Sequence, residues 1–139
     1  MTAVLGMGCR RGCTVEALES LMLACLARHG WPVARVAALA TLNDKCREPG
    51  LRQLAARYRW PLLGFEREQL DSWRQAISRP STAAARHMAV TSVAEAAALA
   101  GCRQLDDSGH VTLLGPRQQS DRATAALAAT VFRPLTESS

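Results

Sequence analysis

The first fourteen residues place an apolar run, a glycine-rich loop with two arginines and a helix start in immediate succession. The apolar run, residues 3–7, predicts a buried strand. The loop that follows holds Arg10 and Arg11, whose forked donors suit carboxylate or phosphate. Its glycines allow a sharp turn close to a ligand, and the next helix points unpaired N–H groups at the loop. This order of elements predicts an anion-binding loop.

Helices and strands alternate along the rest of the chain. Thr14 is a good N-cap for a helix over residues 15–29, which Gly30 ends. Residues 33–40 read as a second strand, so the first forty residues predict a βαβ unit with parallel strands. Further expected elements are a helix from Pro49, a strand over 61–65, a helix over 66–77, a helix over 92–101, and strands over 111–114 and 123–132.

This alternation predicts an α/β fold with three layers, α/β/α. We expect a mixed, mainly parallel five-stranded sheet that ends in an antiparallel hairpin. At 139 residues the chain fits one domain, residues 1–139, because no segment is long enough to link two. Residues 78–87 read as a polar loop, and residues 134–139 as a frayed tail.

Composition narrows the function classes. The net charge is +5, and Lys45 is the only lysine among the 17 lysines and arginines, so the surface suits a polyanionic partner. Aromatic residues make up only 4%, which argues against stacking on single-stranded nucleic acid. Five cysteines without disulfide or metal-ligand spacing indicate reduced thiols and no metal. With no signal peptide or membrane span in the sequence, we expect a cytoplasmic protein that binds neither nucleic acid nor membrane.

Two loops follow the first two predicted strands, at their carboxyl ends. Ligands of α/β sheets bind at these ends, so residues 8–14 and 41–48 are expected to share one crevice. There Lys45 can bind an anion, and Asp44 or Glu48 can move a proton. A structural alternative is that Glu48 only begins the next helix.

Three other patterns have alternative readings. Ser92 and Glu95 match a capping box, which explains both residues without a function. A thiol such as Cys9, beside arginines and at a helix start, can be reactive, but no histidine nearby in the sequence serves as its base. The glycines at positions 6, 8 and 12 also fit a relaxed dinucleotide-binding pattern, although Asp44 comes late for the ribose-binding acid.

Three segments occur in the order of one known family. They read Gly-Met-Gly-Cys-Arg-Arg-Gly-Cys-Thr-Val-Glu-Ala-Leu from Gly6, Thr-Leu-Asn-Asp-Lys-Cys-Arg-Glu-Pro-Gly-Leu from Thr41, and Ser-Val-Ala-Glu-Ala-Ala-Ala-Leu from Ser92. The chain resembles the CobE proteins and the C-terminal domain of CbiG, both of cobalamin biosynthesis, from Val4 to about Ala128. The family motif covers Gly8, Cys9, Arg10, Gly12, Thr41, Asp44, Lys45, Glu48, Gly50, Ser92 and Glu95. Arg117 stands near a lysine position of the family.

The resemblance implies a role in building the corrin ring. CbiG opens a ring-A lactone of a cobalt-precorrin, but this chain resembles only its C-terminal part and is most like stand-alone CobE. One hypothesis is therefore a hydrolase-like activity on a precorrin, without a cofactor. A second is a carrier that passes corrin intermediates between pathway enzymes. A third hypothesis, based on the glycine spacing and not on the resemblance, is a small dinucleotide-binding module.

The sequence thus nominates two groups of site residues for a precorrin, whose ring-edge carboxylates suit a basic crevice. The candidates for catalysis are Asp44, Lys45, Glu48 and Glu95. The candidates for ligand binding are Gly8, Cys9, Arg10, Arg11, Gly12, Thr14, Thr41, Asn43, Ser92 and Arg117.

Overall fold

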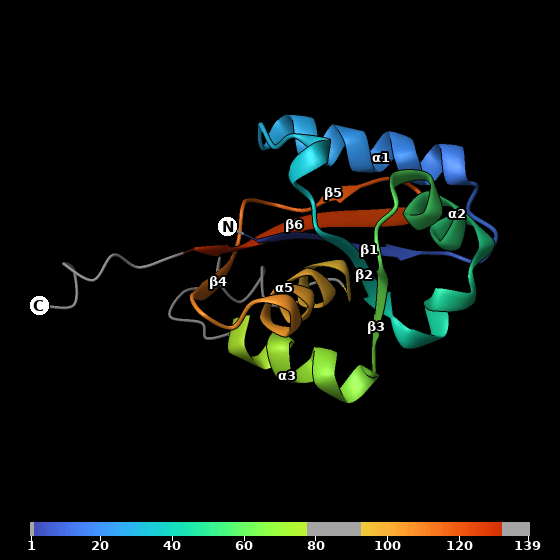
Figure 1. The fold of residues 1–139 in the computed structure, drawn as a ribbon. Coiled ribbons are helices and arrows are strands. Elements are labelled where there is room, and N and C mark those ends of the chain that lie inside the picture. Colours follow the sequence, from blue (N-terminus) through green and yellow to red (C-terminus); the bar gives the residue numbers. More distant parts are fainter. Residues whose placement is uncertain (1, 78–92, 132–139) are drawn as a thin grey trace, which may run out of the picture.

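A computed structural model describes residues 2–77 and 93–131 and shows a six-stranded sheet between two layers of helices (Figure 1). The strands are β1 (Ala3–Cys9), β2 (Ala38–Leu42), β3 (Leu62–Phe65), β4 (His110–Leu113), β5 (Gln118–Gln119) and β6 (Ala123–Val131). The α-helices are α1 (Val15–Arg28), α2 (Pro49–Tyr58), α3 (Arg67–Ile77) and α5 (Val93–Leu105). Two short 3₁₀ helices, η1 (Val33–Arg35) and η2 (Asn43–Arg47), flank β2. The α/β, three-layer prediction is confirmed.

The sheet is mixed, in the order β3-β2-β1-β6-β4. Strands β1, β2 and β3 pair in parallel, whereas β6 runs antiparallel to β1, β4 and β5. The sixth strand, β5, was not expected: it has two residues and lies in the connection between β4 and β6. The expected hairpin of β4 and β6 is present, and the parallel strands form one half of the sheet.

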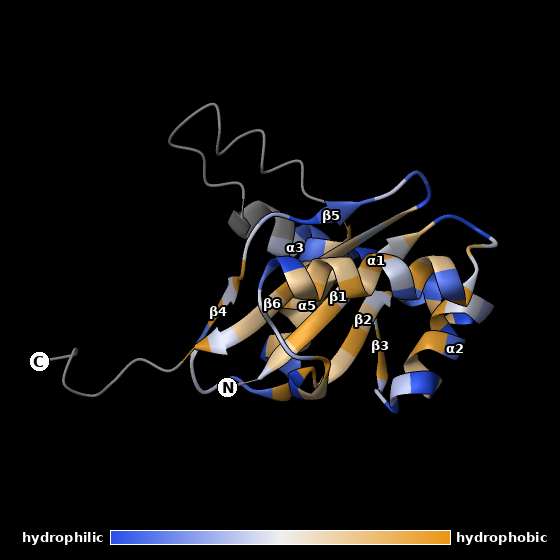
Figure 2. Ribbon diagram, turned by 90° about the horizontal axis from the view of Figure 1, so that it is seen from above, coloured by the Kyte–Doolittle hydropathy of each residue, from blue (hydrophilic) through white to orange (hydrophobic). Residues whose placement is uncertain are grey.

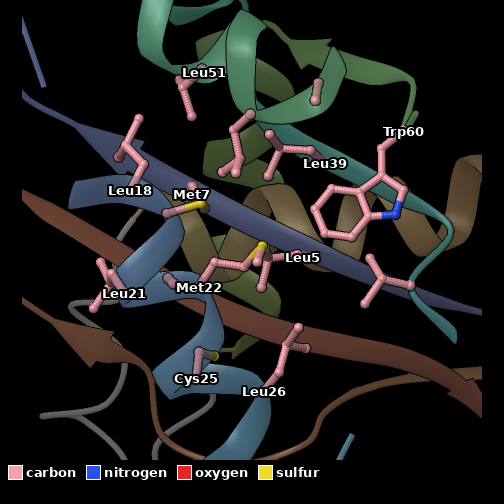
Figure 3. Packing of buried hydrophobic residues seen from close by; sticks show 14 of the residues in the cluster. Leu5, Met7, Leu18, Leu21, Met22, Cys25, Leu26, Leu39, Leu51 and Trp60 are labelled. Carbon is pink, nitrogen blue, oxygen red and sulfur yellow. The ribbon is translucent and has the colours of Figure 1, made fainter. Parts of the chain in front are cut away.

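One face of the sheet packs against α1 and α2. The side chains of alternate β1 residues Ala3, Leu5 and Met7 are fully buried in this cluster, as the period of a strand requires. Figure 3 shows Met22 and other α1 residues packing against Leu5 and Met7 in this cluster. The predicted apolar stripe of the first helix is therefore the inner face of α1.

The opposite face packs against α5, with α3 outside it. Here small residues allow a very close approach between helix and strand. A Cβ atom on Gly6 would lie 1.9 Å from the Ala94 carbonyl oxygen, and one on Gly101 would lie 2.8 Å from Val4 Cγ1. The alanine-rich sequence of α5 is thus explained by packing against β1.

Two element boundaries differ by more than two residues from the sequence-based prediction. The second strand was expected over 33–40, but residues 33–35 form η1 and β2 begins at Ala38. Proline at position 32, in extended conformation, starts that 3₁₀ turn. The last helix was expected to end at Gly101, yet α5 continues to Leu105. Gly101 lies within the helix because a Cβ at this position would clash with Val4 of β1. Ser92, the 78–87 loop and the 134–139 tail lie outside the described residues.

The hydropathy of the residues differs between the strands of the sheet. Figure 2 shows hydrophobic residues concentrated along β1 and β6, while the short strand β5 is hydrophilic. None of the helices in the described ranges is long and apolar enough to cross a membrane.

Candidate functional site

The glycine loop, residues 8–14, joins β1 to α1 at one edge of the sheet (Figure 1). Gly12 has φ +84°, a conformation in which residues with a Cβ are strained. Its backbone N–H donates a hydrogen bond to Glu48 Oε1 at 2.9 Å. Thr14 caps α1, its Oγ1 accepting from the Ala17 N–H at 3.1 Å. The N-cap prediction is confirmed, so the hydroxyl of Thr14 is engaged in the fold.

The start of α2 is fitted against this loop. A Cβ on Gly50 would lie 2.3 Å from the Cys13 carbonyl oxygen and 2.9 Å from Leu18 Cδ1. A larger residue at position 50 would clash with the backbone of Cys13, so glycine here allows α2 to pack directly against the glycine loop. The structure therefore brings the loops 8–14 and 41–48 together, although they are far apart in the sequence.

Cys9, Cys13, Lys45 and Glu48 interact electrostatically in this region. Burial, together with the nearby Cys13 thiol, raises the pKa of Cys9 from 9.0 to about 11; Lys45 opposes this rise and Glu48 adds to it. The thiol of Cys9 is consequently protonated at neutral pH. Cys9 packs against the core, and its raised pKa argues against a role as a thiolate nucleophile.

The polar residues of η2 interact with two different parts of the molecule. Asn43 Nδ2 donates to Glu66 Oε2 at 2.9 Å, on the side of β3 and α3. Gly64 in β3 has no room for a Cβ, which would lie 2.7 Å from both Asn43 Oδ1 and Cys46 Sγ. Asp44 is exposed, whereas Lys45 is half-buried and lies within electrostatic reach of Cys9. Lys45 is therefore the η2 residue that interacts electrostatically with the glycine loop, through Cys9.

Thr41 is fully buried in β2. Its Oγ1 has no hydrogen-bond partner among residues 2–77 and 93–131. The residue after β2 is Asn43, so the strand does not end in the acid that a dinucleotide site uses for the ribose.

Glu95 and Arg117 form a separate polar pair. Glu95 lies in the first turn of α5 and is 3% exposed, and Arg117 Nη1 is 3.4 Å from its Oε1. The N-terminal end of α5 meets β1 close to Gly8, where an added Cβ would be 3.9 Å from Val93 Cβ. The sequence predicted Glu95 as a catalytic residue and Arg117 as a ligand-binding one. The structure joins the two in an ion pair.

Two hollows flank the glycine loop. One, of about 280 Å³, lies between Gly8–Arg10 and residues 119–124. The other, of about 320 Å³, lies between residues 12–16 and the start of α2. Sequence reasoning missed residues 119–124, because their place beside the loop depends on the pairing of β6 with β1.

No group of three or more potential metal ligands occurs in the part of the chain that the structure describes. The five cysteines are free thiols. The glycine loop and η2 bring together arginine, lysine, carboxylate, thiol and backbone N–H groups.

Comparison with known proteins shows which family this chain resembles. Residues 3–128 match the family described as cobalamin synthesis G, C-terminus. The chain belongs to this family. It is 30% identical over 115 residues to a cobalt-precorrin-5A hydrolase of Priestia megaterium, covering 78% of this chain and 30% of the relative. It is 27% identical over 127 residues to a probable cobalt-precorrin-5A hydrolase of Methanocaldococcus jannaschii, covering 89% of this chain and 39% of the relative. The chain thus spans well under half the length of these curated relatives.

Family members of known structure share the fold. CobE, a protein from the cobalamin biosynthetic pathway, aligns with a TM-score of 0.82 and 39% identity over 96% of this chain and 93% of its own. The cobalamin biosynthesis protein chiG of Agrobacterium tumefaciens aligns with a TM-score of 0.70 and 28% identity, over 93% of this chain and 98% of its own. The resemblance to CobE and the CbiG C-terminal domain is confirmed, and this is a cobalamin biosynthesis protein related to cobalt-precorrin-5A hydrolase.

Proposed function

We propose that this chain binds a precorrin or corrinoid polycarboxylate at the glycine loop. The observation that carries the proposal is the hydrogen bond from the Gly12 N–H to Glu48. It holds the loop with Arg10 and Arg11 next to the segment that contains Lys45. Cations and helix-terminal N–H groups thereby converge on one edge of the sheet.

Charge and family membership support this ligand class. Precorrins carry several carboxylates around an apolar macrocycle, and arginines bind carboxylates with two parallel hydrogen bonds. Arg10 and Arg11 are exposed at the loop, and the N-terminus of α1 adds a partial positive charge behind them. Family membership supports the same class, because the family acts in cobalamin biosynthesis.

The catalytic part of the proposal is hydrolysis or proton transfer on the macrocycle. The curated relatives are named cobalt-precorrin-5A hydrolases, which makes this compound the first substrate to test. Lys45 and Glu48 both interact with residues of the glycine loop, so they are the residues proposed to move or stabilise a proton. The exposed residue Asp44 lies next to Lys45 in the chain. Partners would be the enzymes that make and consume the bound intermediate, in the cytoplasm.

A second candidate is a carrier that holds an intermediate without changing it. The observations that favour it are the protonated state of Cys9 and the use of Glu48 as an acceptor for the loop. Neither group is then free to attack a substrate. Both candidates require the same binding site.

The binding proposal is tested with hydrogenobyrinic acid, a stable metal-free corrinoid, followed by its visible spectrum. We expect saturable binding that weakens at higher salt, and a loss of about tenfold in affinity for each of Arg10→Ala and Lys45→Ala. Arg28→Ala is the control, because Arg28 ends α1, about 20 Å from the loop. Unchanged binding in both site variants would overturn the proposal.

Turnover separates the enzyme from the carrier. The purified chain is incubated with cobalt-precorrin-5A, and hydrolysis of the ring-A lactone is followed by mass spectrometry. Catalysis predicts product with the wild-type chain and none with Glu48→Gln, which keeps an acceptor oxygen for Gly12. Binding without product in either protein would favour the carrier.

A further inference from the structure

Arg10 and Arg122 lie opposite each other along the backbone, one position beyond the last pair of β1 with β6. The antiparallel register pairs Cys9 with Ala123, so the next pair along is Arg10 and Arg122. The backbone confirms this position, because the Arg10 N–H donates to the Arg122 carbonyl oxygen at 2.8 Å. Both arginines line the hollow of about 280 Å³ beside Gly8.

The backbone beneath these two arginines is fixed on both sides. The Arg122 carbonyl oxygen also accepts from Cys13 Sγ at 3.4 Å, which links it to the glycine loop. On its other side the Ser120 N–H donates to the Ala123 carbonyl at 2.8 Å, and Ser120 Oγ accepts from the Ala123 N–H at 3.2 Å. These hydrogen bonds fix the backbone at Arg10 and Arg122, so a bound ligand needs to order only the torsions of the two side chains.

Like charges directly opposite each other in an antiparallel pair are destabilising. Side chains at such positions start about 5 Å apart, a spacing that a bound anion can bridge. Asp121 also lines the hollow and reduces its net positive charge. The remaining charge suits a single carboxylate better than a doubly charged group such as phosphate.

We propose that Arg10 and Arg122 form a clamp for one side-chain carboxylate of the macrocycle, with Arg122 as a binding residue supplied by the β5–β6 turn. This proposal rests on the proposed function, since it names the part of the ligand that this hollow holds. It places one edge of the ring over the start of β6, and the rest over the glycine loop and Lys45.

The test compares Arg122→Gln with the control Arg28→Gln, which removes the same charge at the far end of α1. Each protein is titrated with hydrogenobyrinic acid and with its fully methylated ester. We expect Arg122→Gln to weaken binding of the acid about tenfold, and to leave binding of the ester unchanged. Arg28→Gln should match the wild type with both ligands.

Asp121→Asn gives a change of opposite sign. Removing the carboxylate from the hollow should tighten binding of the acid several-fold, and this gain should disappear when Arg122→Gln is added. If the acid binds the wild type but neither Arg122→Gln nor Asp121→Asn alters its affinity, the clamp is refuted and the proposed function stands. If the acid does not bind the wild type at all, both fail together.

Discussion

Glu48 illustrates how one side chain can be read in two ways from sequence and given a third role by the fold. It occupies the N-cap position of α2, yet its side chain makes no capping hydrogen bond to that helix. Its Oε1 instead accepts from the N–H of Gly12, 36 residues earlier. Pro49, the first residue of α2, has no N–H, so this helix start has one unpaired donor fewer, while the Glu48 carboxylate bonds the glycine loop. Glu48 is thus a positioning residue for the anion-binding backbone.

Replacing Glu48 tests that role at the level of one residue. Glu48→Ala removes the acceptor and should weaken corrinoid binding about fivefold, the value of one ordinary hydrogen bond. The Gly12 amide should also exchange with solvent faster, as measured by NMR. Glu48→Gln, which retains an oxygen acceptor, is the matched control and should keep slow exchange. Wild-type affinity and exchange in the alanine variant would contradict this role.

The state of Cys9 makes a second prediction at the residue scale. Because its pKa is raised to about 11, mainly by burial, alkylation by iodoacetamide should be slow at pH 8 and accelerate toward pH 11. The rate is followed by mass spectrometry of the peptide that contains Cys9, with glutathione as the reference thiol. A half-maximal rate near pH 8.5 would show an ordinary thiol and contradict the burial described above.

At the scale of elements, the contact between β1 and α5 has no spare room. Gly6→Ala would place a methyl group inside the van der Waals radius of the Ala94 carbonyl, so the helix must move away. We expect a loss of about 1–3 kcal/mol in the free energy of unfolding, measured with urea. Gly8→Ala, on the same strand, meets only Val93 Cβ at 3.9 Å and should cost much less. Equal losses in the two variants would be evidence against this close packing.

Sequence predicts an element well where a local signal decides it. The cap at Thr14, proline at the first turn of α2 and the apolar stripe of α1 are such signals, and each is confirmed. Gly101 misleads because glycine usually ends a helix, whereas here a side chain of β1 requires it inside one.

The site is less predictable than the elements, for a physical reason. The sequence could place residues 8–14 and 41–48 at one edge of the sheet, since parallel strands share their carboxyl ends. It could not show that Glu48 reaches Gly12, or that Arg117 pairs with Glu95, because both depend on how helices pack. Arg122 was missed because its position depends on the register of β6 against β1.

For the whole molecule, buried thiols make stability depend on pH. Burial raises the pKa of Cys25 and of Cys102 from 9.0 to about 11. The folded state therefore retains protons that the unfolded state releases, so the free energy of unfolding should fall between about pH 9 and pH 11. Cys25 is fully buried, so the free energy of unfolding of Cys25→Ala should fall less between pH 8 and pH 10.5 than that of the wild type. Both values are measured by urea unfolding. An equally steep fall in the variant would exclude Cys25 as a cause.

We propose that a corrin polycarboxylate binds at the edge of the sheet formed by the glycine loop, η2 and the β5–β6 turn. NMR mapping tests it most directly, with the ¹⁵N-labelled chain titrated with hydrogenobyrinic acid. We expect saturable shifts of the backbone amides of residues 8–13, 44–48 and 119–123, and little change along α3 and β4. Saturable shifts centred on α3 or β4, or no shifts at all, would contradict it.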